Sequence, residues 1–87
     1  MTSIKAIIVD PVGLHARPAS ILTKEASKFT SEIKIKSGEK EGNLKSIMNI
    51  MALAIKTNTE VEIQATGTDE KEAIVAIEAA MKENNLI

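Results

Sequence analysis

The chain has 87 residues, 44% of them hydrophobic and 26% charged, which predicts one small globular domain spanning residues 1–87. A net charge of −1 and a single aromatic residue exclude a protein that binds nucleic acid through a basic face or through stacked bases. There is no cysteine, no export signal and no apolar run of about 20 residues, so we expect a cytoplasmic protein without disulfides or membrane insertion.

The N-terminal half of the chain predicts a strand, a helix and a hairpin. Residues 4–9 are rich in β-branched side chains and stop at a proline turn, which is typical of a strand. Over residues 16–29 the apolar side chains recur every three or four positions, so we expect a helix with one buried stripe. Residues 32–36 alternate as a half-buried strand does, and a turn at residues 37–38 would lead into a short return strand over residues 39–42.

The middle of the chain is rich in apolar residues. Residues 44–55 hold more apolar side chains than a helix with one buried face can carry. We therefore expect a short helix over residues 47–53 with Ser46 as its N-cap, where a serine side chain can accept a hydrogen bond from the first turn. A turn at residues 57–59 then precedes a second alternating strand over residues 60–65.

The last element is the clearest amphipathic helix in the sequence. Asp69 followed by Glu72 has the spacing of a capping box, and the helix would end near Asn84. Its apolar stripe consists of Ala73, Ile74, Ile77, Ala80 and Met81. The complete order is β-α-β-β-α-β-α, and each alternating strand is apolar on one face. This pattern predicts an α+β fold in which helices cover one side of a single sheet.

The segment that follows Gly13 carries the chain's only histidine and its only arginine, where a loop becomes a helix. If the helix begins at Ala16, its first N–H groups have no partner within the helix and favour a bound anion such as phosphate. Pro18 is compatible with a first helical turn, and the planar guanidinium of Arg17 suits phosphoryl oxygens. A neutral imidazole is a competent nucleophile near pH 7, so His15 could hold an anionic group covalently and transiently.

The same spacing also fits a surface histidine that merely begins a helix, and the residues alone leave both interpretations open. A metal site is disfavoured, because His15 is the only histidine and no carboxylate lies within helical reach of it. Hydrolase chemistry is disfavoured because Ser20 lies on a different part of the helix and no Gly-x-Ser-x-Gly motif is present. The four glycines form no nucleotide-binding loop, so we expect neither a metal nor an organic cofactor.

A second stretch of chemical interest surrounds Ser46. Capping alone explains a serine at this position, yet a helix start next to Lys45 would also favour an attached phosphate. Ile47, Met48 and Met51 follow directly. These three side chains either pack in the core or form an exposed patch on which partner proteins dock.

Two motifs together resemble one protein family. Gly13-Leu14-His15-Ala16-Arg17-Pro18-Ala19 resembles the active-site signature of HPr, the histidine-containing phosphocarrier of the bacterial sugar phosphotransferase system. Asn43-Leu44-Lys45-Ser46-Ile47-Met48 resembles the regulatory serine segment of HPr from low-GC Gram-positive bacteria and their relatives. The separation of the motifs, the chain length and the order of elements also match. The resemblance implies an open-faced β-sandwich, with a four-stranded antiparallel sheet in the order 1-4-2-3 and three helices on one face.

The resemblance also implies a function. The chain would be a phosphocarrier and not an enzyme: Nδ1 of His15 would accept a phosphoryl group from phosphorylated enzyme I, which phosphoenolpyruvate charges, and pass it to IIA domains of sugar permeases. The Arg17 side chain would bind the phosphate, together with the backbone at Ala16 and Arg17. Ser46 would be phosphorylated by the ATP-dependent HPr kinase/phosphorylase, and that form would act with catabolite control protein A in catabolite repression.

The chain is expected to act as a monomer whose partners dock on Ala16, Ser20, Ile47, Met48 and Met51. Asn49 departs from the family pattern, because many Gram-positive relatives carry glycine there; this affects docking around the regulatory serine and not the histidine chemistry. Two other classes stay open. One is a regulatory relative of HPr whose phosphorelay controls nitrogen metabolism or transcription, and the other is a small ligand-binding α+β domain without phosphoryl chemistry.

Overall fold

The computed structural model describes residues 1–87, and its elements follow the predicted order. They are β1 (Thr2–Ile7), α1 (Ala16–Ala26), β2 (Glu32–Ser37), β3 (Lys40–Asn43), α2 (Ile47–Ala52), β4 (Glu60–Thr66) and α3 (Glu70–Glu83). None of the three helices combines the length and the apolar character that crossing a membrane requires.

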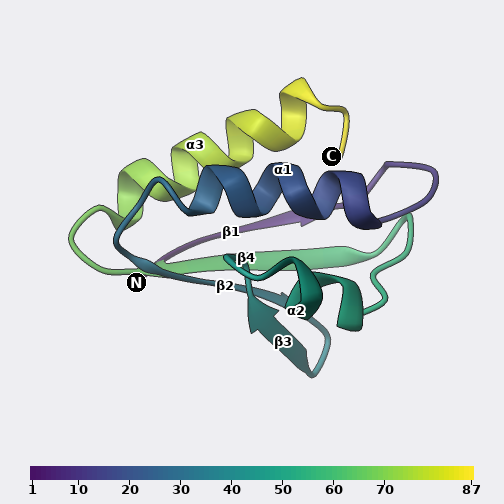
Figure 1. The fold of residues 1–87 in the computed structure, drawn as a ribbon, viewed down its shortest axis with the longest axis horizontal. Coiled ribbons are helices and arrows are strands. Elements are labelled where there is room, and N and C mark those ends of the chain that lie inside the picture. Colours follow the sequence, from purple (N-terminus) through teal and green to yellow (C-terminus); the bar gives the residue numbers. More distant parts are fainter.

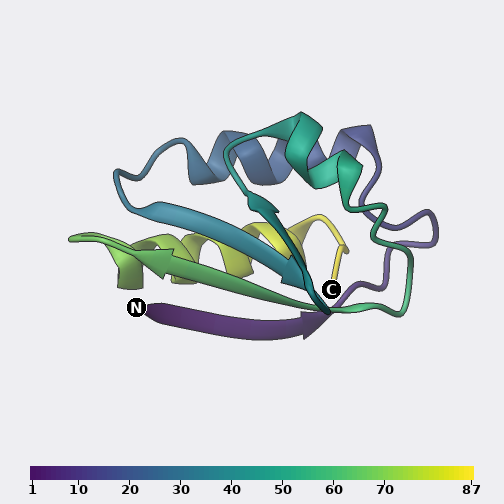
Figure 2. The ribbon, with the colours of Figure 1, turned by 90° about the horizontal axis from the view of Figure 1, so that it is seen from below.

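The four strands form one antiparallel sheet in the order β1-β4-β2-β3. Ile63 of β4 lies opposite Ile4 of β1 on one side and opposite Ile35 of β2 on the other. The helices cover one face of this sheet, with α1 and α3 packed side by side and the short α2 close to β3 (Figures 1 and 2). The predicted α+β fold, its strand order and its three helices are confirmed.

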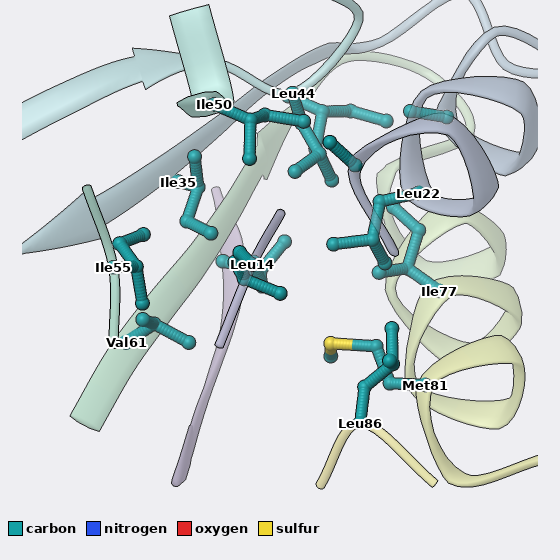
Figure 3. Packing of buried hydrophobic residues seen from close by; sticks show 14 of the residues in the cluster. Leu14, Leu22, Ile35, Leu44, Ile50, Ile55, Val61, Ile77, Met81 and Leu86 are labelled. Atoms are coloured by element: carbon teal, nitrogen blue, oxygen red, sulfur yellow. The ribbon is translucent and has the colours of Figure 1, made fainter. Parts of the chain in front are cut away.

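Alternation along the central strands decides which face the helices cover. Ile33 and Ile35 in β2 and Val61 and Ile63 in β4 are buried, whereas the residues between them are charged or polar and only partly covered. The helices complete this hydrophobic core (Figure 3) with side chains that include Leu22, Ile50, Ile77 and Met81. Burial of one such side chain stabilises the fold by about 1.5–3 kcal/mol.

Element boundaries differ from the prediction by up to three residues. β1 begins two residues before the predicted 4–9, because Thr2 and Ser3 already pair with β4, and it ends two residues early, where Ile8 bonds to the turn that precedes β4. α1 ends before the predicted Phe29, because the N–H group of that residue bonds only three residues back, in a tightened turn. β3 lies one residue beyond the predicted 39–42, and the other elements agree to within one residue.

The capping box predicted for α3 is wrong in its detail. Asp69 stands at the N-cap but makes no side-chain bond to its own helix. Its carboxylate instead accepts bonds from the backbone N–H groups of Thr30 and Ser31, both with an N···O distance of 2.9 Å, and from both hydroxyls. Glu70, and not Glu72, reaches back and accepts a bond from a backbone N–H group of the preceding loop (N···O 3.2 Å).

These bonds keep the two carboxyl groups at the start of α3 ionised to low pH. The hydroxyl of Ser31, followed by the backbone N–H of Thr30, lowers the pKa of Asp69 from 3.8 to about 2. The hydroxyl of Thr2, followed by a backbone N–H and the terminal amine, lowers the pKa of Glu70 from 4.5 to about 2. The start of α3 thereby joins β1, the loop before β2 and the N-terminus.

Candidate functional site

The loop between β1 and α1 is held in one shape by backbone hydrogen bonds. A turn closes where the N–H of Gly13 donates to the carbonyl of Asp10 (N···O 2.9 Å), and the N–H of Val12 donates to the Asp10 carboxylate (N···O 3.0 Å). The N–H of Leu14 donates to the carbonyl of Ile55 (N···O 2.9 Å), and the Leu14 side chain is buried. The chain is therefore fixed immediately before α1 begins.

Gly13 is required by the shape of this loop. Its φ of +83° lies in the left-handed region, which glycine adopts without the steric cost that a Cβ atom brings. A Cβ atom here would lie 2.4 Å from the carbonyl oxygen of Ile55 and 2.8 Å from Cα of Lys56. Only a residue without a side chain allows the loop to pass this close to the segment that precedes β4.

His15 stands at the N-cap of α1 and leaves the start of the helix open. Its carbonyl accepts a helical bond from the N–H of Ala19 (N···O 3.0 Å), but its ring makes no cap bond. The N–H groups of Ala16 and Arg17 have no partner within the helix, and Pro18 has no N–H group. The imidazole is partly accessible, with 37% of the side chain exposed, beside two free backbone donors.

The electrostatics of this helix start favour an added anion. The first turn of α1 contains no acidic residue, although negative charge is what stabilises the positive end of a helix. It carries instead the guanidinium of Arg17, which is exposed and takes part in none of the ion pairs. The helix start that follows the ring thus offers two free N–H groups and one unpaired, exposed cation.

Asp10 is a neighbour of His15 that the sequence analysis missed. As the sequence predicts, α1 itself places no carboxylate within reach of His15. The turn before the helix, however, folds Asp10 back toward the ring. Its Oδ1 atom lies 3.6 Å from Nε2 of His15, and its side chain is only 10% exposed. The turn spacing from Asp10 to Gly13 was the available signal, because such a turn returns its first residue toward the next element.

No group of acidic residues, histidines or cysteines in the fold has a metal-binding arrangement.

Ser46 is the N-cap of α2 in the structure, as the sequence predicts. Its hydroxyl oxygen accepts bonds from the backbone N–H of Asn49 (N···O 3.2 Å) and from the side-chain amide of the same residue (N···O 3.1 Å). The amide oxygen of Asn49 accepts a further bond from the N–H of Asn43 (N···O 3.2 Å). Asn49 therefore ties the hydroxyl of Ser46 to the end of β3.

Lys45 does not lie free beside Ser46, in contrast to what adjacency in sequence suggests. Its ammonium donates to the carbonyl of Phe29 (N···O 2.7 Å), and the hydroxyl of Thr23 donates to the carbonyl of Leu44 (O···O 3.1 Å). These two bonds join the segment before α2 to α1 and to the loop after it. The residues around Ser46 and the helix that begins at His15 are therefore held together.

The residues expected to dock partners are all exposed. Exposure is 37% for Ile47, 80% for Met48 and 47% for Met51, and it is high for Ala16 and Ser20 as well. The alternative that the three apolar residues pack in the core is wrong. The core takes Ile50 and Leu53 from this stretch instead. Because α2 packs against α1, the apolar patch belongs to the same helical layer as His15 (Figure 2).

Known proteins match this chain over nearly its whole length. A family model described as the PTS HPr component phosphorylation site matches residues 2–83. Phosphocarrier protein HPr of Mycoplasma capricolum is 62% identical over 87 residues, which cover 100% of this chain and 98% of the relative.

Solved structures give the same result. A histidine-containing phosphocarrier protein of Mycoplasma, 62% identical, superposes with a TM-score of 0.97 over 99% of this chain and 98% of that one. An HPr dimer from Thermoanaerobacter tengcongensis, 39% identical, superposes with a TM-score of 0.76 over 97% of each chain. Sequence, family model and fold agree, and the chain belongs to the HPr family, the phosphocarrier proteins of the phosphotransferase system.

Proposed function

We propose that His15 is the residue that carries the phosphoryl group, attached at Nδ1 of its ring. The group comes from phosphorylated enzyme I, which phosphoenolpyruvate charges, and passes to the IIA domains of sugar permeases. The observation that supports this most is the open start of α1, where the only histidine of the chain directly precedes two free N–H groups and an unpaired arginine. The chain is a carrier in this scheme, and its partners complete each transfer site.

Each transfer exchanges one bond to phosphorus for another. The lone pair of Nδ1 attacks the phosphorus on enzyme I, the N–P bond forms, and the electron pair of the broken bond returns to the donor atom. The reverse exchange hands the group to the IIA domain. The backbone N–H groups of Ala16 and Arg17 and the guanidinium of Arg17 would bind the phosphoryl oxygens, and these charge-assisted bonds would stabilise the attached group.

The proposed docking surface surrounds this helix start. It combines the exposed apolar side chains of α2 with the small exposed residues of α1, namely Ala16, Ser20, Ile47, Met48 and Met51. Methionines adapt to several partner shapes, which suits a carrier that meets both a donor and several acceptors. In this proposal the carrier acts as a monomer. It works in the same compartment as its donor, the cytoplasm.

Incubation with phosphoenolpyruvate and enzyme I tests the role of His15. We expect one acid-labile phosphate per chain, located on His15 by peptide mapping, and none in His15→Ala. The fold of that variant should be intact, because the ring is partly exposed and makes no hydrogen bond. Ser46→Ala is the matched control and should be labelled like the wild type. Acid-stable label that persists in His15→Ala, with enzyme I as the only donor, would refute the assignment.

A second modification is proposed at Ser46. An ATP-dependent HPr kinase/phosphorylase would phosphorylate its hydroxyl, and the product would act with catabolite control protein A. The position is supported by the partial exposure of Ser46 and by the apolar patch that begins at the next residue. Asn49 should slow this phosphorylation, because its side-chain amide donates a hydrogen bond to the hydroxyl that must react.

Two variants of Asn49 test whether its side-chain amide slows the phosphorylation of Ser46. Asn49→Ala removes the side-chain amide without the helix cost of glycine, which is about 1 kcal/mol, and Asn49→Gly restores the residue that many Gram-positive relatives carry. With kinase and ATP, both should incorporate phosphate on Ser46 faster than the wild type, by about threefold for the loss of one neutral hydrogen bond. Equal rates in all three proteins would show that the amide does not restrain the hydroxyl.

A further inference from the structure

We propose that Asp10 is a positioning residue for His15: its carboxylate keeps the ring proton on Nε2, so that Nδ1 presents its lone pair, and it balances the positive charge that the ring acquires with phosphate. This inference rests on the proposed role of His15 and extends it to a residue outside the segment that resembles the family signature. It is carried by geometry, since Oδ1 of Asp10 lies 3.6 Å from Nε2.

The carboxylate is fixed independently of the ring. Oδ1 accepts the backbone N–H of Val12 (N···O 3.0 Å), and the carbonyl of Asp10 accepts the N–H of Gly13 (N···O 2.9 Å). The side chain is 10% exposed, so that little water separates it from its neighbours. A charge held this firmly within a turn can orient a ring that is itself partly exposed and free of other hydrogen bonds.

The side of the ring that faces Asp10 determines which nitrogen can react. A neutral imidazole has one protonated nitrogen and one with a lone pair, and an anion beside Nε2 favours the proton there. The 3.6 Å separation is longer than an N–H···O hydrogen bond, whose upper range is about 3.2 Å. Such contacts are often long in the absence of the reaction partner and tighten in the complex.

The same contact balances charge during the transfer. When Nδ1 attacks phosphorus, the N–P bond forms while Nε2 keeps its proton, so the ring becomes positively charged. The Asp10 carboxylate faces that charge. When the next acceptor attacks, the electron pair of the N–P bond returns to the ring, which becomes neutral again. No proton has to enter or leave the ring at either step.

The competing explanation is that Asp10 only closes the turn. Neutral variants separate the two roles, because the carbonyl of asparagine and the hydroxyl of serine can both still accept the N–H of Val12. Asp10→Asn and Asp10→Ser therefore keep the turn and remove the charge. Glu72→Gln is the matched control: it also removes one exposed negative charge, but at the start of α3, at the other end of the helical layer from His15 (Figure 1).

The first measurement needs no partner protein. With ¹⁵N labelling, the two ring nitrogens of the only histidine give unambiguous signals, which are read at about pH 9, where an ordinary imidazole is neutral. We expect the wild type and Glu72→Gln to show the proton on Nε2. Asp10→Asn and Asp10→Ser should show a mixture of both tautomers. Identical spectra in all four proteins would overturn the proposal, whether or not enzyme I labels the chain.

The second measurement is the kinetics of phosphorylation by enzyme I. Because Asp10 is covered, we expect its neutral variants to lower kcat by about three- to tenfold and to leave the KM for the carrier unchanged. A change of KM alone would show that Asp10 contributes to partner docking and not to positioning the ring. Wild-type kinetics in either folded variant would show that Asp10 only closes the turn. Failure of the wild type to become labelled would refute the proposed function, whereas the ring spectra would still decide the role of Asp10.

Discussion

The two long helices begin in opposite ways. At the start of α1, His15 makes no cap bond, two N–H groups are free and Arg17 has no ion-pair partner. At the start of α3, two carboxylates are bonded: Asp69 receives four bonds from Thr30 and Ser31, and Glu70 bonds to Thr2, a loop N–H and the terminal amine. The two starts lie at opposite ends of the same helical layer (Figure 1).

The difference shows where this fold places its polar interactions. Side chains at the start of α3 join segments that are far apart in the sequence, so they contribute to the stability of the folded chain. Donors at the start of α1 are left without partners, which costs little because they are accessible to water, and they remain available to an anion. Changes at the α1 start should therefore alter phosphoryl transfer, whereas changes at the α3 start should alter stability.

Arg17→Ala should give the largest effect on transfer. It removes the guanidinium that is proposed to bind the phosphate, and the loss of one donor to the charge that develops in transfer costs about 100-fold in rate. The free energy of unfolding should change by less than about 0.5 kcal/mol, because the side chain is exposed and unpaired. Rates with enzyme I and urea denaturation check the two parts.

Arg17→Lys serves as the comparison for that variant. Lysine keeps the positive charge but loses the planar pair of donors, so its rate should lie between those of the wild type and Arg17→Ala. A strong loss of stability in either variant would contradict the claim that the start of α1 contributes little to the fold.

Gly13→Ala should affect both properties. Its φ of +83° and the 2.4 Å approach of a Cβ atom to the carbonyl of Ile55 force the loop to move, which should lower the free energy of unfolding by about 2 kcal/mol. The displaced ring of His15 should slow transfer by about tenfold. Gly38→Ala is the control, because φ there is also positive but no atom lies near the added Cβ. A similar loss in both variants would mean that strain alone, and not contact with Ile55, restricts Gly13.

The order of elements and the buried stripes could be predicted from sequence because they depend on local periodicity. The alternation in β2 and the three- to four-residue spacing in α1 act over a few neighbours, and the structure agrees with both. Gly13 and Ser46 were also placed correctly, as a turn residue and an N-cap, since their roles depend on the local backbone.

Other features depend on contacts that no local pattern contains. Asp69 looks like a capping residue, but its partners Thr30 and Ser31 lie 39 and 38 residues away and are brought near only by the folded sheet. The approach of Asp10 to His15 depends on how tightly the turn closes. The bond of Asn49 to Ser46 spans three residues and was within reach of sequence reasoning, which treated Asn49 only as a departure from the family pattern.

Ser46→Asp tests the comparison at a third helix start, where the cap is closed by Asn49. The added negative charge lies beside the apolar patch and should slow association with partners that are acidic around their own sites, by about threefold at low salt. The effect should fade as salt is raised, because exposed charges are screened. Ser46→Asn, which is neutral and can also cap a helix, is the control. Transfer rates equal to the wild type in both variants would count against electrostatic control of docking.

Asp69→Asn should leave phosphoryl transfer unchanged and alter only the response of stability to acid. The pKa of Asp69 is about 2 in the folded chain and 3.8 ordinarily, so the carboxylate stabilises the fold fully above about pH 5, and this contribution is lost as the pH falls toward 2. The amide of asparagine cannot accept from all four donors of Thr30 and Ser31. The Tm of the variant should therefore lie below that of the wild type at pH 7, and the two values should converge near pH 2. Glu72→Gln, which removes an exposed carboxylate from the same helix start, is the control for the loss of one charge. A Tm difference for Asp69→Asn that does not change with pH would show that its hydrogen bonds do not stabilise the folded chain through ionisation.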